Sequence, residues 1–302
     1  MTKTELKKTV VKIKKLLKKR DYDVIDTGIE LARGLDEPAV FETLLEGCSL
    51  DEEGKLVRNK IFSGTGPAQP FLDYALLNLI AYAPENTELD ESLKFLNIKL
   101  LSFSDLAWTE LPSCIACLTN LTNLVLRSSV TKTCSSLQNV DVLANLTKLT
   151  SLDLRSCSSL QNADGLSNLT NLTSLNLLGC ESLQNVDGLS NLTNLTSLNL
   201  GSCDSLQNAD GLSNLTNLTS LNLTWCKSLQ NVDGLANLTK LPNLDLARCI
   251  SLQNVDGLAN LPNLTNLDLF RCDKVQPKPY PPWMQGREEV AAYQEEIKKS
   301  MK

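Results

Sequence analysis

The sequence predicts an α/β solenoid, in which short strands and turns stack in regular repeats behind a small N-terminal helical domain. A leucine recurs at an interval of 23 residues, which is a solenoid period. Each interval holds one short apolar alternation, typical of a strand, followed by a turn that is Asp-Gly in most repeats. The first 90 residues lack this period and instead place apolar residues at helical spacing. The recurring leucines are Leu137, Leu160, Leu183, Leu206, Leu229 and Leu252.

One repeat unit shows how strand and return path alternate. Leu152 and Leu154 flank Asp153, so a strand here points both leucines to one side and the aspartate to the other. Leu166 lies three residues before the next leucine, which favours a tight helical turn or a 3₁₀ segment, with Asp164 available to cap it. Strands inside and turns outside predict a horseshoe.

A single unit buries too few apolar side chains to offset the entropy of ordering 23 residues, so the units must stack. Stacking leaves the first and last repeats exposed, and both ends therefore need caps. We expect a helical N-terminal capping domain at 1–90, a repeat solenoid at 91–275, and a C-terminal extended segment with a capping helix at 276–302.

The residues of the unit resemble a known family. Leu149-x-x-Leu152-x-Leu154-x-x-Cys157-x-x-Leu160 is similar to the cysteine-containing class of leucine-rich repeats, and Val232–Thr239 is similar to the internalin-type repeats of bacterial proteins. The resemblance covers roughly residues 93–275. It implies the leucine-rich-repeat horseshoe and protein binding on its concave face. The 23-residue period departs from the longer unit of the cysteine-containing class, so that class's link to ubiquitin-ligase adaptors is not carried over.

The segments before the regular repeats are divergent. A strand is expected near Val125, and five extra residues after Leu126 form a loop on the rim. Leu96 and Ile98 belong to a pattern that indicates a degenerate first repeat, together with Leu111 and Ile115. Helices are expected at 4–20, from Asp36 through Leu45, and over 71–82, with a loop at 64–67.

A column of cysteines occupies one position per repeat, and we interpret it as a ladder of buried free thiols that form weak hydrogen bonds to the backbone of the turn. Stacked equivalent side chains point in parallel, so they do not form disulfides. Cys114 and Cys117 could form a metal or redox pair, but two further zinc ligands are missing nearby. The column comprises Cys134, Cys157, Cys180, Cys203, Cys226, Cys249 and Cys272.

Histidine is absent from the chain, which excludes a Ser-His-Asp triad, a Cys-His dyad and every histidine-based zinc site. The aspartates of the repeats are separated by whole repeats, and no pair of them is set apart from its equivalents. The Gly64-Thr65-Gly66 stretch lacks the Lys-Ser/Thr ending of a phosphate-binding loop. We therefore expect no catalytic activity, no metal and no cofactor.

Variation between nearly identical repeats points to a binding surface. Large aromatic and arginine side chains, which dominate binding energy at interfaces, gather toward the C-terminal end. Neutral drift after recent duplication is the alternative explanation. The predicted partner-binding residues on the concave face and its rim are Arg127, Arg155, Asp153, Asn176, Leu178, Asn199, Asn222, Thr224, Trp225, Asp245, Arg248, Asp268, Phe270 and Arg271.

The formal net charge of −6 is unevenly distributed, because residues 1–20 carry nine Lys and Arg against Glu5 alone. This basic helix permits a rival function, attachment to nucleic acid or an anionic membrane surface, although it is explained as well by the solvated face of a capping helix. We expect a protein or peptide partner and a monomer. The sequence shows no apolar run long enough to span a bilayer and no secretory leader, so we expect a cytoplasmic protein, with a secreted bacterial effector as the main variant.

The C-terminal tail is expected to close the solenoid. Consecutive prolines in 278–283 predict an extended segment, and a helix should follow from about Arg287. Its apolar side would carry Val290, Tyr293, Ile297 and Met301. We expect Trp283 and this helix to fold back as a cap, and the rival is a free docking motif for another protein.

Overall fold

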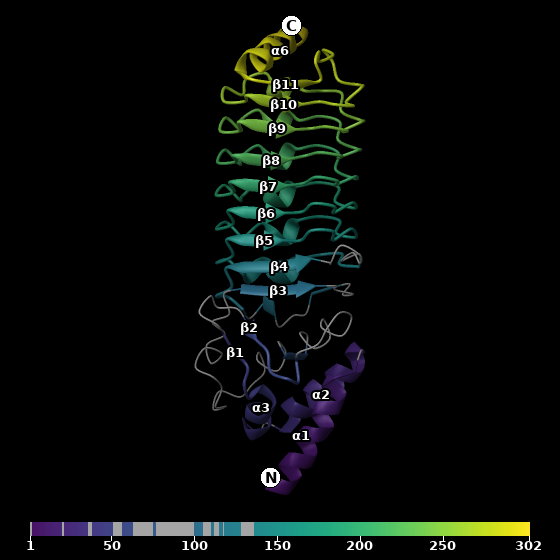
Figure 1. The fold of residues 1–302 in the computed structure, drawn as a ribbon, viewed down its shortest axis with the longest axis vertical. Helices are drawn as coiled ribbons and strands as arrows, with labels where there is room; N and C mark the ends of the chain where they lie inside the picture. Colours follow the sequence, from purple (N-terminus) through teal and green to yellow (C-terminus); the bar gives the residue numbers. More distant parts are fainter. Residues whose placement is uncertain are drawn as a thin grey trace.

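The protein is described by a computed structural model in which the two ends of the chain lie at opposite ends of one column (Figure 1). Within the described residues, no helix is both long and apolar enough to cross a membrane. The described residues are 2–19, 21–35, 38–50, 56–62, 75–76, 100–104, 110–111, 115–116, 118–127 and 136–302.

Within the described residues up to 62, three helices and a short hairpin form the start of the chain. Helix α1 (Lys3–Leu17) buries Val10, Ile13 and Leu17, as its apolar spacing predicts. Four of its lysines are exposed, at positions 7, 8, 12 and 15. The other elements are α2 (Tyr22–Leu35), α3 (Pro38–Leu45), and the antiparallel strands β1 (Ser49–Leu50) and β2 (Leu56–Val57).

Helix α2 was not predicted from the sequence. Ile25, Ile29 and Ala32 are buried at helical spacing, and that signal was available. Two glycines weakened it, and one of them has a packing role: a Cβ on Gly28 would lie 2.9 Å from Cβ of Leu16 in α1. Of the expected helix at 71–82, only residues 75–76 are described, and they are helical; the loop at 64–67 lies outside the described residues.

Nine strands form one sheet that runs from β3, near the middle of the column, to its C-terminal end (Figure 1). The first eight are parallel neighbours in chain order, one from each repeat, and the last is antiparallel. We call the outward side of this sheet the strand face; it corresponds to the concave face of the expected horseshoe. The strands are β3 (Leu100–Ser104), β4 (Asn123–Arg127), β5 (Ser151–Asp153), β6 (Ser174–Asn176), β7 (Ser197–Asn199), β8 (Ser220–Asn222), β9 (Asn243–Asp245), β10 (Asn266–Asp268) and β11 (Trp283–Gln285).

The first strand of the sheet lies later than the sequence analysis placed it. Leu101 and Phe103 of β3 pair with Leu124 and Leu126 of β4, so they occupy the two strand-leucine positions that were assigned to residues 96 and 98. The spacing from Leu101 to Leu124 is the same 23 residues as in the regular repeats. Phenylalanine in place of the second leucine hid this signal. The predicted rim loop after residue 126 lies almost wholly outside the described residues.

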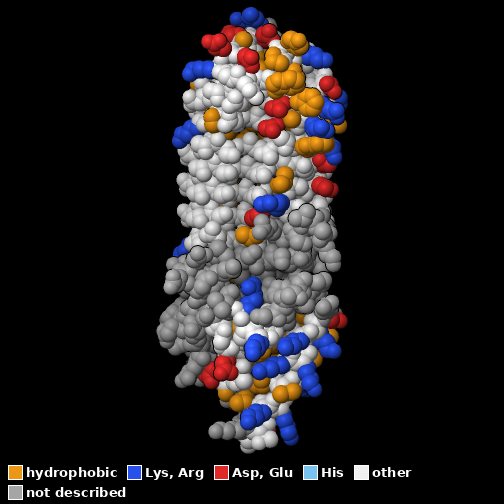
Figure 2. All heavy atoms as spheres, in the orientation of Figure 1, with side chains coloured by type: hydrophobic (Ala, Val, Ile, Leu, Met, Phe, Trp, Pro, Cys, Tyr) orange, Lys and Arg blue, Asp and Glu red, His pale blue; other side chains and the backbone are white. Residues whose placement is uncertain are grey.

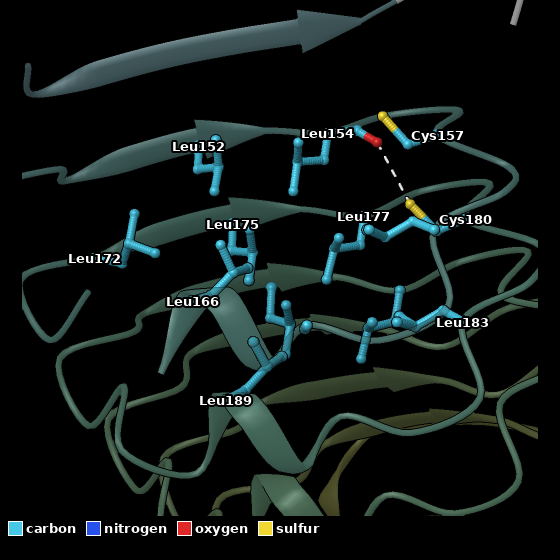
Figure 3. Close-up of a cluster of buried hydrophobic side chains, with 14 of the residues drawn as sticks. Leu152, Leu154, Cys157, Leu166, Leu172, Leu175, Leu177, Cys180, Leu183 and Leu189 are labelled. Atoms are coloured by element: carbon cyan, nitrogen blue, oxygen red, sulfur yellow. Dashed lines mark hydrogen bonds between the residues drawn. The ribbon is translucent and has the colours of Figure 1, made fainter. Parts of the chain in front are cut away.

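Leucines fill the interior between the sheet and the return path. Leu152 and Leu154 point to the same side as their equivalents Leu175 and Leu177 in the next repeat, and Leu166 reaches them from the return path (Figure 3). The return path contains one 3₁₀ segment per repeat, as expected from the leucine spacing. These segments are Asp141–Asn145, Asp164–Leu166, Asp187–Leu189, Asp210–Leu212, Asp233–Leu235 and Asp256–Leu258.

The expectation that Asp164 caps its 3₁₀ segment is wrong. The N-cap residue is Ala163, which makes no side-chain cap hydrogen bond, and the N–H of Asp164 donates to Oδ1 of Asn162 at 3.1 Å. Asparagine two residues earlier reaches the same backbone amide by a local turn. The Asn of the repeated Gln-Asn pair is therefore the residue that fixes the turn.

The glycine of the Asp-Gly pair is required by close approach between repeats. A Cβ on Gly211 would lie 2.2 Å from the carbonyl oxygen of Val186 in the preceding repeat, and one on Gly234 would lie 2.0 Å from that of Ala209. Both contacts are with backbone, which cannot rotate away. This column therefore fixes how closely successive return segments pack.

The cysteines join neighbouring repeats through hydrogen bonds. Sγ of Cys180 donates to the carbonyl oxygen of Leu154 at 3.4 Å (Figure 3), and Sγ of Cys203 donates to that of Leu177 at 3.3 Å. The close acceptor is the carbonyl at the strand end of the preceding repeat, which corrects the expected partner; Cys226 also makes a long contact, of 4.0 Å, with Thr224 of its own turn. All six ladder cysteines from Cys157 to Cys272 are buried free thiols, whereas Cys134, Cys114 and Cys117 lie outside the described residues.

Replacing Cys203 with serine should destabilise the middle of the solenoid by about 1–2 kcal/mol, because a more polar hydroxyl is buried in the same apolar layer. Burial and the neighbouring thiols raise the pKa of Cys203 well above its usual range, so this thiol should also resist alkylation in the native protein. Urea unfolding and mass spectrometry after alkylation check both points. We expect ten free thiols after denaturation, and disulfide-linked peptides would contradict the cytoplasmic expectation.

The C-terminal tail covers the last repeat. Strand β11 pairs with β10, with Met284 opposite Leu267, and helix α6 (Arg287–Ser300) packs against the end of the solenoid. Nε2 of Gln294 donates to the carbonyl oxygens of Leu258 and Leu261 at 2.8 and 3.0 Å, which satisfies two acceptors of the last return segment. The division into three domains stays a prediction.

Three details of the tail differ from expectation. Met301 does not share the buried side of α6: it lies just after the last residue of the helix and is 54% exposed. Met284 is buried, whereas Trp283 lies on the strand face and is 53% exposed, since alternate residues of a strand point to opposite sides. The proline segment bends at 276–277 and 280–282 and is not uniformly extended.

Candidate partner-binding site

The Asn or Asp that ends each strand has a structural role that sequence reasoning missed. Oδ1 of Asn199 accepts a hydrogen bond from the N–H of Gly201 at 3.1 Å, and Oδ1 of Asn222 accepts one from Thr224 at 2.9 Å. The same turn occurs at each of the six positions, which are Asp153, Asn176, Asn199, Asn222, Asp245 and Asp268. One side-chain oxygen of each of these six predicted binding residues is thus already used inside the protein.

The turn places the residue three positions after this Asn or Asp in the left-handed backbone region, which a glycine adopts without strain. In one repeat that residue is Gly179, with φ of 76°. Trp225, Arg248 and Arg271 have φ of 62°, 66° and 60°, a conformation that is a genuine outlier for a bulky side chain. Three large side chains therefore occupy positions where the backbone favours glycine.

These residues join two other aromatics in one cluster at the C-terminal end of the strand face. The Arg248 guanidinium lies 4.1 Å from the ring centre of Trp225, and that of Arg271 lies 5.5 Å from the ring centre of Phe270. Phe270 in turn lies 6.2 Å from Trp283, ring centre to ring centre. We call these five residues the C-terminal cluster. Its exposed hydrophobic members are Trp225, Phe270 and Trp283.

Figure 2 shows the same gathering of side-chain types. The middle of the solenoid presents mainly uncharged polar atoms in this view, whereas hydrophobic, acidic and basic side chains collect around its C-terminal end. The predicted residues are thus not equivalent in surroundings, although they are equivalent in repeat position.

A groove of about 380 Å³ opens beside the C-terminal cluster on strands β8 to β11. Asn243, Asp245, Asn266 and Asp268 form its floor, and Trp283 forms one wall. We call it the C-terminal groove. Burial raises the pKa of the Asp245 carboxyl, the nearby carboxylate of Asp268 raises it further, and the turn hydrogen bond from Ala247 partly opposes both effects.

The predicted residues nearer the N-terminus are spread along the sheet and make fewer aromatic contacts. The Arg155 guanidinium pairs with Asp153 at 3.1 Å. Leu178 and Thr224 are half-buried on the strand face. The side chain of Arg127 lies outside the described residues. The role of these residues in binding stays a prediction.

The described residues contain no group of three or more His, Cys, Asp or Glu that could hold a metal ion. The Cys114 and Cys117 pair lies outside them. The ladder thiols point into the core, where they cannot reach a substrate.

Comparison with known proteins agrees with this repeat geometry. Six copies of the BspA type leucine rich repeat region match residues 155–276. The repeat region is a leucine-rich-repeat solenoid. The resemblance to leucine-rich repeats stated from the sequence is therefore confirmed, and domains of this kind use their extended strand surfaces for binding.

Three solved structures are similar to parts of this chain. Internalin C2 from Listeria monocytogenes matches with a TM-score of 0.50 and 25% identity, over 69% of this chain and 86% of that chain. The leucine-rich repeat domain of the type III effector XopL matches with a TM-score of 0.49 and 19% identity, over 78% and 82%. The plant peptide hormone receptor RGFR1 in complex with RGF2 matches with a TM-score of 0.36 and 21% identity, over 60% and 39%. A search of curated proteins gave no significant match.

Proposed function

We propose that this leucine-rich-repeat protein is a non-catalytic scaffold that binds a protein or peptide on the C-terminal cluster of the strand face. The observation that carries the proposal is that the left-handed repeat position, which holds Ser156, Gly179 and Ser202 in earlier repeats, holds the large side chains of Trp225, Arg248 and Arg271. A non-glycine residue in a sparsely populated backbone region costs on the order of 1 kcal/mol or more, and such strain gathers at functional sites.

Folding does not explain these side chains. Trp225 remains 42% exposed, so its indole contributes only part of its area to the solenoid. The array contains a relaxed alternative at the same position in Gly179. Trp and Arg side chains are enriched among the residues that dominate binding energy at protein interfaces, and the Arg248 guanidinium already lies over the ring of Trp225.

A Trp225→Gly/Arg248→Ala variant should bind the partner at least tenfold more weakly and unfold at an unchanged or higher temperature. Glycine relieves the left-handed strain, by about 1 kcal/mol. Proteins captured from a lysate by the immobilised full chain would be identified by mass spectrometry, and their dissociation constants for each variant measured.

The matched control is Gln230→Ala/Gln253→Ala, which changes two exposed side chains of the same two repeats outside the C-terminal cluster. It should bind as the wild type does. The proposed site would be contradicted by a partner that binds the cluster variant as tightly as the wild type but no longer binds the control variant.

Two alternative functions use the same fold: attachment to an anionic surface, and action as a secreted effector. The exposed lysines of α1 would support attachment to an anionic surface, although the buried Val10, Ile13 and Leu17 already explain why that helix is amphipathic. A secreted bacterial effector would use the same partner-binding surface in a host cell. We place the protein in the cytoplasm, as a monomer, and the seven described free cysteines support that placement.

A further inference from the structure

The C-terminal groove holds two carboxylates on adjacent strands. Asp245 and Asp268 are direct partners in the pairing of β9 with β10. Each uses Oδ1 to accept the turn N–H, from Ala247 at 2.9 Å and from Phe270 at 2.7 Å. Neither carboxylate forms an ion pair with any described residue of the chain. Two carboxylates therefore lie side by side on the groove floor, with no ion-pair partner in the part of the chain that the structure describes.

The solenoid itself shows which group a strand-end aspartate takes as partner. Asp153 occupies the same repeat position, and the guanidinium of Arg155, two residues later, pairs with it at 3.1 Å. The residues two positions after the groove aspartates are Ala247 and Phe270, which carry no charge. The position that supplies the cation in one repeat is thus uncharged in both groove repeats.

The wall of the groove favours the same kind of ligand. Trp283 lies directly opposite Asp268 in the pairing of β10 with β11 and is half exposed. Aromatic faces attract ammonium and guanidinium groups, and carboxylates do so more strongly. The chain's own nearby guanidiniums, those of Arg248 and Arg271, are stacked on Trp225 and Phe270 at the rim.

We propose that the C-terminal groove binds an arginine or lysine side chain from an extended segment of the partner protein. The cationic head lies between Asp245 and Asp268, and its methylene stem lies along Trp283. The groove volume of about 380 Å³ is at the lower end of the range for small-ligand sites and suits one long side chain. This inference rests on the proposed function and specifies the chemistry of its partner.

The test uses the immobilised full chain and a displayed library of random linear heptapeptides. Peptides selected by the wild type should be enriched in arginine or lysine at one position. Their affinity should fall at least tenfold for Asp245→Asn/Asp268→Asn, and it should weaken as salt is added. The asparagine pair keeps the fold, because Asn199 and Asn222 form the same turn hydrogen bond at equivalent positions.

The control Asp187→Asn/Asp210→Asn removes two charges from exposed positions on the return path and should bind the selected peptides as the wild type does. Enrichment of Asp and Glu, with loss of binding in Arg248→Ala/Arg271→Ala, would overturn the cation site and leave the proposed function intact. Selected peptides without charge preference, unaffected by the asparagine pair, would do the same. Failure to enrich any peptide would overturn the proposal that the groove binds an extended cationic segment. Capture of partners from a lysate with the cluster variants would still decide the proposed function.

Discussion

Replacing Gly211 with alanine is expected to destabilise the solenoid by about 2–3 kcal/mol, the upper part of the range for overpacked positions. The added methyl would lie 2.2 Å from the carbonyl oxygen and 2.5 Å from the carbonyl carbon of Val186, so the two repeats must separate. Separation would also lengthen the hydrogen bonds between neighbouring strands. Urea unfolding followed by circular dichroism measures the loss.

Gly34→Ala is the matched control, because nothing lies within 4 Å of a Cβ at Gly34 in helix α2. Alanine is the better helix former by about 1 kcal/mol, so this variant should be as stable as the wild type or slightly more stable. If Gly211→Ala is as stable as the wild type, successive return segments can move apart without cost. That result would contradict the role of these glycines in close packing between repeats.

Truncation after Lys274 is expected to lower the melting temperature by on the order of 10 °C and to promote aggregation. It removes β11, leaves the edge of β10 unpaired, and exposes Leu267 and Leu269 at the end of the core. It also removes the apolar side of α6. Thermal unfolding and light scattering of the shortened chain test this directly.

A pair of single variants separates capping from a docking role for α6. Ile297 is fully buried, and Ile297→Ala should cost about 2–4 kcal/mol. Met301→Ala, one helical turn later and exposed, should leave stability unchanged. Unchanged stability of the truncated chain, together with lost partner binding, would favour the free docking motif instead.

The solenoid was predictable because its signal repeats. The 23-residue leucine period and the Leu-x-Leu alternation fix strand and core positions in every regular repeat, and an error at one place is corrected by the others. The first strand was misplaced because Phe103 replaces a leucine where only one neighbouring repeat could correct it. The hydrogen-bond acceptor of the cysteine thiols was also missed. Which carbonyl a thiol reaches depends on how the strand of one repeat and the turn of the next are offset along the solenoid, and that offset is set by backbone geometry.

The candidate site was only partly predictable. The large residues Trp225, Arg248 and Phe270 stood out against repeats that are otherwise nearly identical. The left-handed backbone of Trp225, Arg248 and Arg271 follows the strand-end Asx turn, which the Asn or Asp of each repeat signals. Gly179 at the same repeat position is a further clue. The groove could not have been found from the repeats, because its wall comes from Trp283, which reaches the sheet only when the proline segment reverses the chain.

Hydrogen–deuterium exchange of the full chain with and without the captured partner tests the central claim most directly. The proposal predicts slower exchange at the turns after β8, β9 and β10, which carry Trp225, Arg248 and Arg271, and at strand β11. Protection confined to helices α1 to α3 or to the 3₁₀ segments of the return path, with none at those turns, would contradict it.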